Sequence, residues 1–140
     1  MRVDGACLCR QVEFEAEVEP SRVLICHCTD CQTHSGSAFR TIVVTNPGSF
    51  RLKSGGLKTY QKSAESGRTR RLAFCPECGT AIYGGPPEGE AGPLSLRLGT
   101  LRQRDELEPV AQIWCRSSRP WLDRLGELPR IDTQAGSQPR

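Results

Sequence analysis

Cys75-Pro76-Glu77-Cys78-Gly79 has the form of a zinc knuckle, in which two cysteines flank a tight turn. Such a turn presents both sulfur atoms to one point, and Gly79 allows it to close with a positive φ. Near the start of the chain, Cys7-Leu8-Cys9 does something similar, because residues i and i+2 of an extended segment share a face. Pairing the two motifs gives four thiolates, the ligand set of a closed tetrahedral zinc site.

A second group of cysteines occupies the segment Cys26-His27-Cys28-Thr29-Asp30-Cys31. It offers three thiolates, and three protein ligands with an open fourth position are typical of a catalytic zinc. An open position allows the metal to bind a thiol or water and to lower its pKa, which generates a nucleophile at neutral pH. The seven clustered cysteines could also divide differently, with Cys115 or a histidine completing the second site.

The residues around these clusters have less specific interpretations. His27 lies between two ligands and would point away from them on an extended chain, which favours a packing or surface role. His34 follows Cys31 by three residues; it reaches the metal, acts as a proton shuttle, or is a solvated loop residue. We expect Cys115 to be a buried apolar thiol. Both tryptophans are expected to be anchors of the core.

The composition suggests why metal cross-links would matter. The chain has 140 residues, which suits one domain. Leu, Ile, Val and Phe together make up about a fifth of it, close to the level below which chains tend to be disordered. Another 14 glycines and 10 prolines offer little to bury. The apolar core is therefore thin, and a metal ion tying residue 7 to residue 78 would compensate for it.

The same composition argues against several classes of protein. A net charge of +3 is too small to indicate nucleic-acid binding. No apolar run approaches the roughly 18 residues of a membrane span, and the first residues lack the apolar stretch of a secretory signal. We therefore expect a cytoplasmic protein, in which clustered cysteines are more often metal ligands or catalysts than disulfides. A thioredoxin-like redox motif is disfavoured because no βαβ pattern surrounds either Cys-x-x-Cys. The oligomeric state stays open.

The predicted fold is mainly β, a single zinc-stabilised domain of short antiparallel strands. The clearest strand is Val12–Val18, in which four apolar residues alternate with three glutamates, so that one face should be buried. A short helical turn is expected to start at Thr29 or Asp30, which are both capable N-caps. The domain should cover residues 1–131, followed by a loosely ordered tail at 132–140. The other expected strands are Arg22–Cys26, Ala38–Thr45, Arg70–Phe74, Ala81–Tyr83, Leu94–Leu98 and Val110–Trp114.

Several ordered motifs make the chain resemble the glutathione-dependent formaldehyde-activating enzymes, the group that also includes the centromere protein V relatives. The similarity runs from Gly5 to about Leu128, nearly the whole chain. The motifs are Gly5-Ala6-Cys7-Leu8-Cys9, Val12-Glu13-Phe14-Glu15, Cys26-His27-Cys28-Thr29-Asp30-Cys31, Ser35-Gly36-Ser37-Ala38-Phe39, Arg71, Phe74-Cys75-Pro76-Glu77-Cys78-Gly79-Thr80, Ile82-Tyr83, Gly99-Thr100-Leu101, Pro109 and Trp121.

The resemblance implies a β-rich fold shared with small zinc-binding Rab-accessory proteins. It also implies condensation of glutathione with formaldehyde to S-(hydroxymethyl)glutathione, a carbon–sulfur lyase activity in which a zinc-bound thiolate attacks the aldehyde. One departure leaves the substrate open: Arg102-Gln103-Arg104 stands where the family commonly continues with acidic residues and a proline. The implied ligands are Cys7, Cys9, Cys75 and Cys78 for a structural zinc, and Cys26, Cys28 and Cys31 for a catalytic zinc.

Three further residues are candidate contacts to a small thiol such as glutathione. Ser35 and Gly36 follow the three-cysteine segment, where the glycine could let the backbone approach a ligand or could form an ordinary turn. Arg71 belongs to a basic run with Arg68 and Arg70, which could pair with carboxylates through the guanidinium fork or could lie on a solvated strand.

Two other functions compete with an enzyme. One is a non-enzymatic zinc-stabilised binding module, because the sequence offers no sure general base. The weaker one is a redox-regulated protein.

Overall fold

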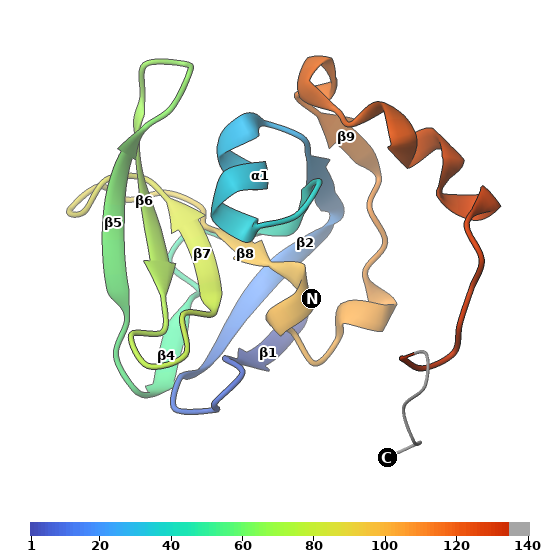
Figure 1. The fold of residues 1–140 in the computed structure, drawn as a ribbon. Helices are drawn as coiled ribbons and strands as arrows, with labels where there is room; N and C mark the ends of the chain where they lie inside the picture. The colour runs from blue at the N-terminus through green and yellow to red at the C-terminus, as the bar shows by residue number, and fades with distance from the viewer. Residues whose placement is uncertain (135–140) are drawn as a thin grey trace.

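The computed structural model describes residues 1–134, which form nine strands, one α-helix and four short 3-10 helices (Figure 1). The expected mainly β fold class is thereby confirmed. Of the predicted tail at 132–140, residues 135–140 lie outside the described part of the chain, and the boundary at residue 131 stays a prediction. The strands are β1 (Arg2–Ala6), β2 (Glu13–Cys26), β3 (Arg40–Thr45), β4 (Arg51–Ser54), β5 (Lys58–Ser63), β6 (Thr69–Phe74), β7 (Ala81–Gly85), β8 (Ser95–Arg97) and β9 (Ala111–Ile113). The helices are α1 (Thr29–Ser35), η1 (Leu98–Thr100), η2 (Arg104–Glu106), η3 (Cys115–Ser117) and η4 (Pro120–Glu127).

Strand β2 is longer than the sequence suggested and connects two parts of the sheet. Two separate strands were expected around the exposed residues 19–22, but the backbone stays extended through them. Its first part pairs with β1 and β4, and its second part pairs with β3 and β9. The register shifts between Val18 and Val23, so the segment around Pro20 marks an irregularity in the ladder rather than the end of the strand.

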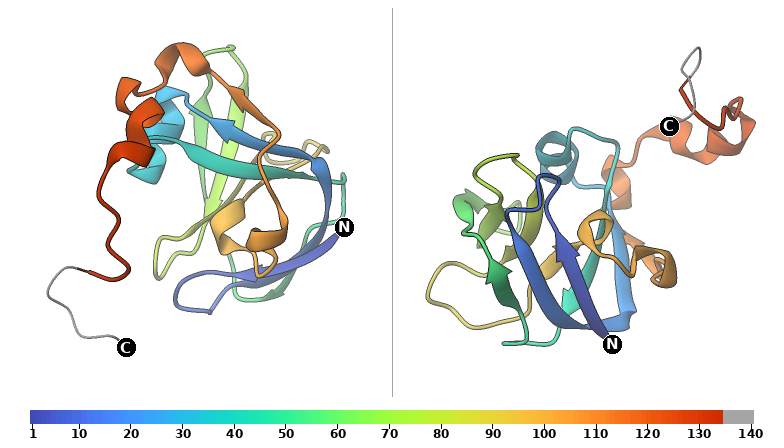
Figure 2. Two further views of the ribbon diagram at one scale, coloured as in Figure 1. Left: turned by 90° about the vertical axis from the view of Figure 1, so that its right-hand side faces the viewer. Right: turned by 90° about the horizontal axis from the view of Figure 1, so that it is seen from below.

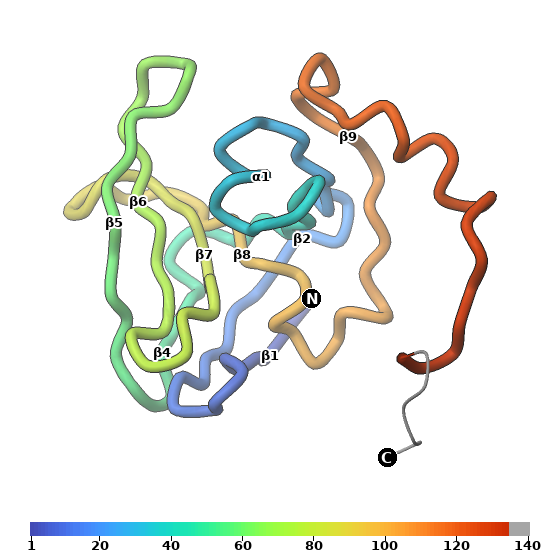
Figure 3. The backbone as a smooth tube through the Cα atoms, viewed as in Figure 1, coloured from blue at the N-terminus to red at the C-terminus, as the bar shows by residue number. Residues whose placement is uncertain are grey.

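The remaining strands complete one connected sheet. Its order is β1-β2-β3-β8-β7-β6-β5, with β4 and β9 each pairing with β2. Of the pairings within residues 1–134, that of β2 with β9 is parallel and the others are antiparallel. The backbone trace shows the β1–β2 turn and the β6–β7 turn close together at one end of the sheet (Figure 3). Helix η4 lies on the outside of the molecule in both further views (Figure 2).

Strands β1, β4 and β5 were not predicted. Strand β4 is exposed along its whole length, and β5 is exposed at five of its six residues. Neither strand therefore has the buried apolar face that produces an alternating pattern. Both form by pairing with a neighbour, β4 with β2 and β5 with all six residues of β6.

The core includes the strand face that was predicted to be buried, and neither tryptophan belongs to it. Val12, Phe14, Ala16 and Val18 are all at most 2% exposed, which confirms the predicted inner face of this strand. The Phe14 ring stacks on Phe50, which in turn stacks on Tyr83, with centroid distances of 5.4 and 5.1 Å.

The expectation that both tryptophans anchor the core is wrong. Trp114 and Trp121 are 38% and 46% exposed. Both follow β9, where the chain continues in short helices that have no buried residues. No helix within residues 1–134 is long and apolar enough to cross a membrane.

We predict that Gly5→Ala destabilises the fold. Gly5 lies opposite Phe14 in the β1–β2 ladder, and a Cβ atom there would lie 2.5 Å from the Thr100 carbonyl oxygen and 2.6 Å from the Phe14 ring. Such overpacking should lower the free energy of unfolding by about 1–3 kcal/mol in a urea titration. Gly56→Ala is the control, because a Cβ atom at Gly56 would have no neighbour within 4 Å. Equal stability of the two variants would contradict the close packing at Gly5.

Candidate metal centres

The four cysteines of the two turns converge at one end of the sheet. Cys7 and Cys9 lie in the β1–β2 turn, Cys75 and Cys78 lie in the β6–β7 turn, and their sulfur atoms are all within 4.8 Å of one another. The Sγ–Sγ distances are 3.5 Å between Cys7 and Cys9 and 3.8 Å between Cys9 and Cys75. Four sulfurs at about 2.3 Å from one zinc ion would lie about 3.8 Å apart. The donor set and its spacing therefore fit a closed tetrahedral zinc site.

Local hydrogen bonds shape this four-cysteine cluster. The Leu8 N–H donates to the Thr80 hydroxyl oxygen at 3.1 Å, which joins the two turns directly. Gly79 has the expected positive φ, 75°, and its N–H donates to the Cys75 carbonyl oxygen at 2.9 Å. Hydrogen bonding by the Thr80 hydroxyl and by backbone amides lowers the pKa of the Cys78 thiol to about 5. The thiolate is the form that binds a metal.

The second cluster forms where β2 passes into α1. Cys26 ends β2, Cys28 precedes α1, Cys31 lies in its first turn, and the three sulfur atoms are within 4.8 Å of one another. The N-cap of α1 is Cys28 rather than the expected Thr29 or Asp30, because its sulfur accepts a hydrogen bond from the Cys31 N–H at 3.2 Å. Capping the helix and gathering three sulfurs are thus achieved by the same turn.

Neither a histidine nor the eighth cysteine completes this three-cysteine cluster. Within residues 1–134, the side chains close enough to share one ion there are the three cysteines. Cys115 is exposed, so the expected buried position is wrong; it begins η3, a short surface helix without buried residues. His27 is 2% exposed, and its Nε2 contacts the Gln112 Oε1 atom at 2.7 Å, which confirms a packing role.

His34 lies beside the three-cysteine cluster and is held by Arg40. The Arg40 Nη2 atom lies 2.6 Å from the His34 Nδ1 atom. A guanidinium only donates hydrogen bonds, so Nδ1 is the acceptor and the ring proton is assigned to Nε2. Burial, together with the positive charge of Arg40, lowers the pKa of His34. The lowered pKa favours the neutral imidazole, in which Nδ1 accepts the hydrogen bond from Arg40.

A cavity of about 310 Å³ opens onto the three sulfur atoms. His34 lines it, together with five basic side chains: Arg40, Lys62, Arg68, Arg70 and Arg97. A neighbouring cavity of about 550 Å³ shares His34, Arg40 and Arg97 as a common wall. Three cysteine sulfurs and five basic side chains therefore share one cavity.

The three candidate thiol contacts lie at different places around these cavities. Ser35 lines the neighbouring cavity. Gly36 is the C-cap of α1, with a φ of 67°, and its N–H donates to carbonyl oxygens of that helix. Arg71 lies over the Tyr83 ring at 5.6 Å, on the strand face opposite Arg70, because neighbouring residues of β6 point to opposite faces. A ligand contact by any of the three stays a prediction.

The sequence match decides the family. Residues 2–117 match the profile of the family described as "Glutathione-dependent formaldehyde-activating enzyme". The chain belongs to this family. It is also 30% identical over 80 residues to an uncharacterized lyase of Schizosaccharomyces pombe, a match that covers 57% of the chain and 55% of that relative. The chain spans about half the length of the Schizosaccharomyces pombe relative that it matches.

A solved structure shows the same fold. It is a Rhodobacter sphaeroides protein that is 20% identical in sequence, with a TM-score of 0.59, and the match covers 78% of the chain and 98% of that protein. An identity this low supports the fold alone.

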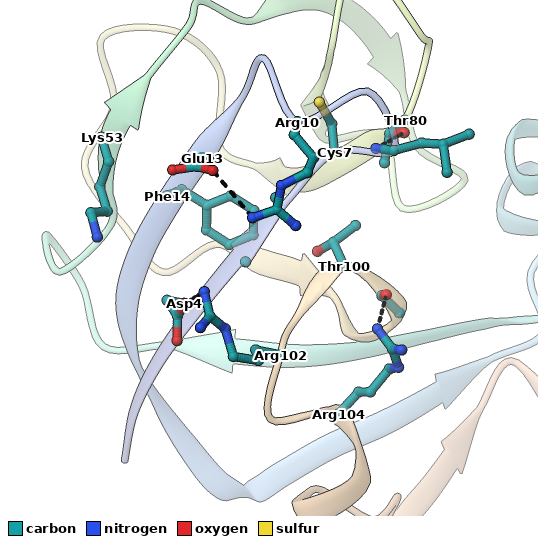
Figure 4. A pocket seen from close by; sticks show the side chains of 14 residues that line it. Asp4, Cys7, Arg10, Glu13, Phe14, Lys53, Thr80, Thr100, Arg102 and Arg104 are labelled. Carbon is teal, nitrogen blue, oxygen red and sulfur yellow. Dashed lines mark hydrogen bonds and ion pairs between the residues drawn. The ribbon is translucent and has the colours of Figure 1, made fainter.

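A larger cavity, of about 700 Å³, lies beside the four-cysteine cluster (Figure 4). Arg102 and Arg104, which depart from the family pattern, line it. Two of its four cations are paired: Arg102 lies 2.7 Å from the Asp4 carboxylate, and Arg10 lies 3.3 Å from the Glu13 carboxylate. The segment that was expected to depart from the family pattern therefore borders this groove, while a different set of cations lines the cavity at the three-cysteine cluster.

Two residues of the three-cysteine cavity, Arg40 and Arg97, were missed in the sequence. Arg40 is 6% exposed, and the Nε atom of Arg97 is buried. Each lies next to apolar residues in or beside a short strand. At such a position the sequence pattern predicts that an arginine side chain faces the solvent. The usable signal was a charged residue within an otherwise apolar run, at Leu96-Arg97-Leu98.

We predict that Cys75→Ser removes one of two zinc equivalents. Its sulfur is fully buried between the two turns, so its loss should lower the unfolding midpoint by roughly 10 °C or more, because the binding free energy of such a site stabilises the fold. Elemental analysis and thermal unfolding would measure both effects. Cys115→Ser is the matched control and should keep both zinc ions and the wild-type midpoint. Two zinc equivalents in Cys75→Ser would overturn the four-cysteine assignment.

Proposed function

We propose that the protein is a zinc-dependent enzyme that forms or breaks a carbon–sulfur bond between a thiol, such as glutathione, and an aldehyde carbon. The observation that carries this proposal is a set of three cysteine sulfurs with no fourth protein ligand among residues 1–134, open to a cavity of about 310 Å³. Family membership supports glutathione and formaldehyde as the reactants.

The two clusters would have different tasks. Cys7, Cys9, Cys75 and Cys78 would hold a structural zinc, since four protein sulfurs leave no position for a substrate. Cys26, Cys28 and Cys31 would hold the catalytic zinc, which when bound supplies a Lewis acid that lowers the pKa of a thiol in its fourth position.

The side chains around the second cluster orient the reactants. With Nδ1 occupied by Arg40, the His34 ring presents Nε2–H as its remaining donor, and the ring lines the cavity. It would donate a hydrogen bond to the aldehyde oxygen, where negative charge develops as the bond forms. Arg40 acts as a positioning residue, because it fixes the tautomer of His34.

The proposed reaction balances within its two reactants. A sulfur electron pair forms the new bond to the aldehyde carbon, and the carbonyl π pair moves to oxygen. The proton that leaves the thiol ends on that oxygen. The product is a hemithioacetal, which for formaldehyde is the S-hydroxymethyl adduct, and no further reactant is needed. In the reverse direction the same groups release the thiol and the aldehyde, which corresponds to a lyase.

We predict that Cys28→Ser loses the second zinc and the activity but keeps the fold. Serine is also a good N-cap, so the start of α1 should survive the change. Formation of S-(hydroxymethyl)glutathione above the spontaneous rate should fall by about 100-fold or more, since the step would lose its metal-stabilised charge. Cys115→Ser, an exposed cysteine outside both clusters, should retain wild-type activity and both zinc ions.

Two results would contradict the proposal. Wild-type activity in a Cys28→Ser protein that lacks the second zinc would remove the catalytic role of this cluster. A wild-type protein that holds two zinc ions and binds thiols, but accelerates no adduct formation with any aldehyde, would instead indicate the non-enzymatic binding module.

A further inference from the structure

The cavity at the three-cysteine cluster carries more positive charge than its own carboxylates balance. Of the five basic side chains that line it, Lys62 lies 2.8 Å from the Asp30 carboxylate. Within residues 1–134, the guanidinium groups of Arg40, Arg68, Arg70 and Arg97 have no carboxylate within 4.0 Å. In the groove beside the four-cysteine cluster, by contrast, two of the four cations, Arg10 and Arg102, are paired with carboxylates.

Arg40 is the most buried of these cations, but it is held against His34, whereas Arg97 is half-buried beside it in the cavity lining. The Nε atom of Arg97 is buried and has no hydrogen-bond partner in the described chain, and burial lowers the pKa of Arg97 to about 9. The fold nevertheless makes room for it. A Cβ atom at Gly84, on the neighbouring strand β7, would lie 3.1 Å from the Arg97 Nη2 atom. Because Gly84 has no side chain, it leaves space for the Arg97 guanidinium.

The negative charge of a metal centre with its thiolates would balance only part of the positive charge of these arginines. A divalent ion with three thiolates carries one negative charge, and a fourth thiolate, from the substrate, would raise this to two. Arg68 is exposed. The three enclosed arginines, Arg40, Arg70 and Arg97, therefore carry three positive charges, and a surplus of about one remains in a site where an uncompensated buried charge is costly. An anionic group on the ligand would remove this cost.

We propose that Arg97, together with the neighbouring Arg70, binds a carboxylate of the thiol substrate. This rests on the proposed function, because it assumes that a thiol reaches the three-cysteine cluster. A guanidinium binds a carboxylate through two parallel hydrogen bonds, which orients the substrate as well as holding it. The three cysteines, Arg70 and Arg97 line one cavity of about 310 Å³, so a single molecule can reach both the cluster and the guanidinium groups.

Cobalt(II)-loaded protein allows the thiol and the anion to be tested together. Thiolate binding to cobalt is followed by its charge-transfer absorption, with 3-mercaptopropionate as the anionic thiol and 2-mercaptoethanol as the neutral one. We expect 3-mercaptopropionate to bind the wild type about 10-fold more tightly, in line with one charge-assisted hydrogen-bonded pair. Equal affinity for the two thiols in the wild type would overturn the proposal.

Variants of Arg97 test whether this residue causes the preference for the anionic thiol. In Arg97→Gln the preference should fall below about twofold, and in Arg97→Lys, which keeps the charge but loses the fork, it should be intermediate. Arg104→Gln is the matched control, because Arg104 lines the other groove, and it should keep the full preference. An unchanged preference in Arg97→Gln would exclude Arg97 as the anion site. Cobalt content and unfolding midpoint are measured for each variant.

A thiol-free ligand separates this proposal from the proposed function. S-methylglutathione carries two carboxylates but no thiol, and calorimetry should show that it binds the wild type at least about fivefold more tightly than Arg97→Gln. If it does so while no thiol gives a charge-transfer band, the anion site stands and the thiolate chemistry fails. If thiols give the band without any dependence on Arg97, the thiolate chemistry stands and the anion site fails.

Discussion

Four sulfur atoms from two distant turns lie within 4.8 Å of one another, and much of the structure depends on that closeness. Bringing residue 7 to residue 78 closes a loop that includes five of the nine described strands, which is costly in chain entropy. The Leu8–Thr80 hydrogen bond joins the same turns, but one such bond contributes little by itself. A metal ion shared by the four thiolates would hold this junction strongly, because the binding free energy of such a site adds to the free energy of folding.

Strand β2 connects this junction to the three-cysteine cluster. It begins a few residues after Cys9 and ends at Cys26, so one continuous strand runs from the four-cysteine turn to the three-cysteine site. On its way it pairs with four other strands, and its inner face includes Phe14, which is fully buried. The second cluster can therefore stay open on one side, since its position is set by a strand that is fixed elsewhere.

The parts of the fold that could be predicted are those where burial leaves a periodic pattern or where chemistry requires a spacing. The alternation from Val12 to Val18 and the two cysteine groups are of this kind, and both are found in the structure. Strands such as β4 and β5 could not be predicted, because pairing with a neighbour defines them rather than an apolar face. Cys115 was wrongly placed in the core, because its local sequence resembles a strand while the chain there turns onto the surface. The enclosed position of Arg97 was missed because it depends on the space left by Gly84, a residue of a different strand.

Trp114 has a left-handed backbone conformation, with a φ of 58°, and its ring lies over the Arg116 guanidinium at 5.2 Å while bordering the cavity of the three-cysteine cluster. The chain has two tryptophans, and Trp121 lies in the outer segment η4, away from the residues that line this cavity. Ligand entry would replace water beside one indole and leave the other as it was. The protein thus contains its own fluorophore at the mouth of the site, and Trp121→Phe would leave an emission signal that comes from the cavity alone.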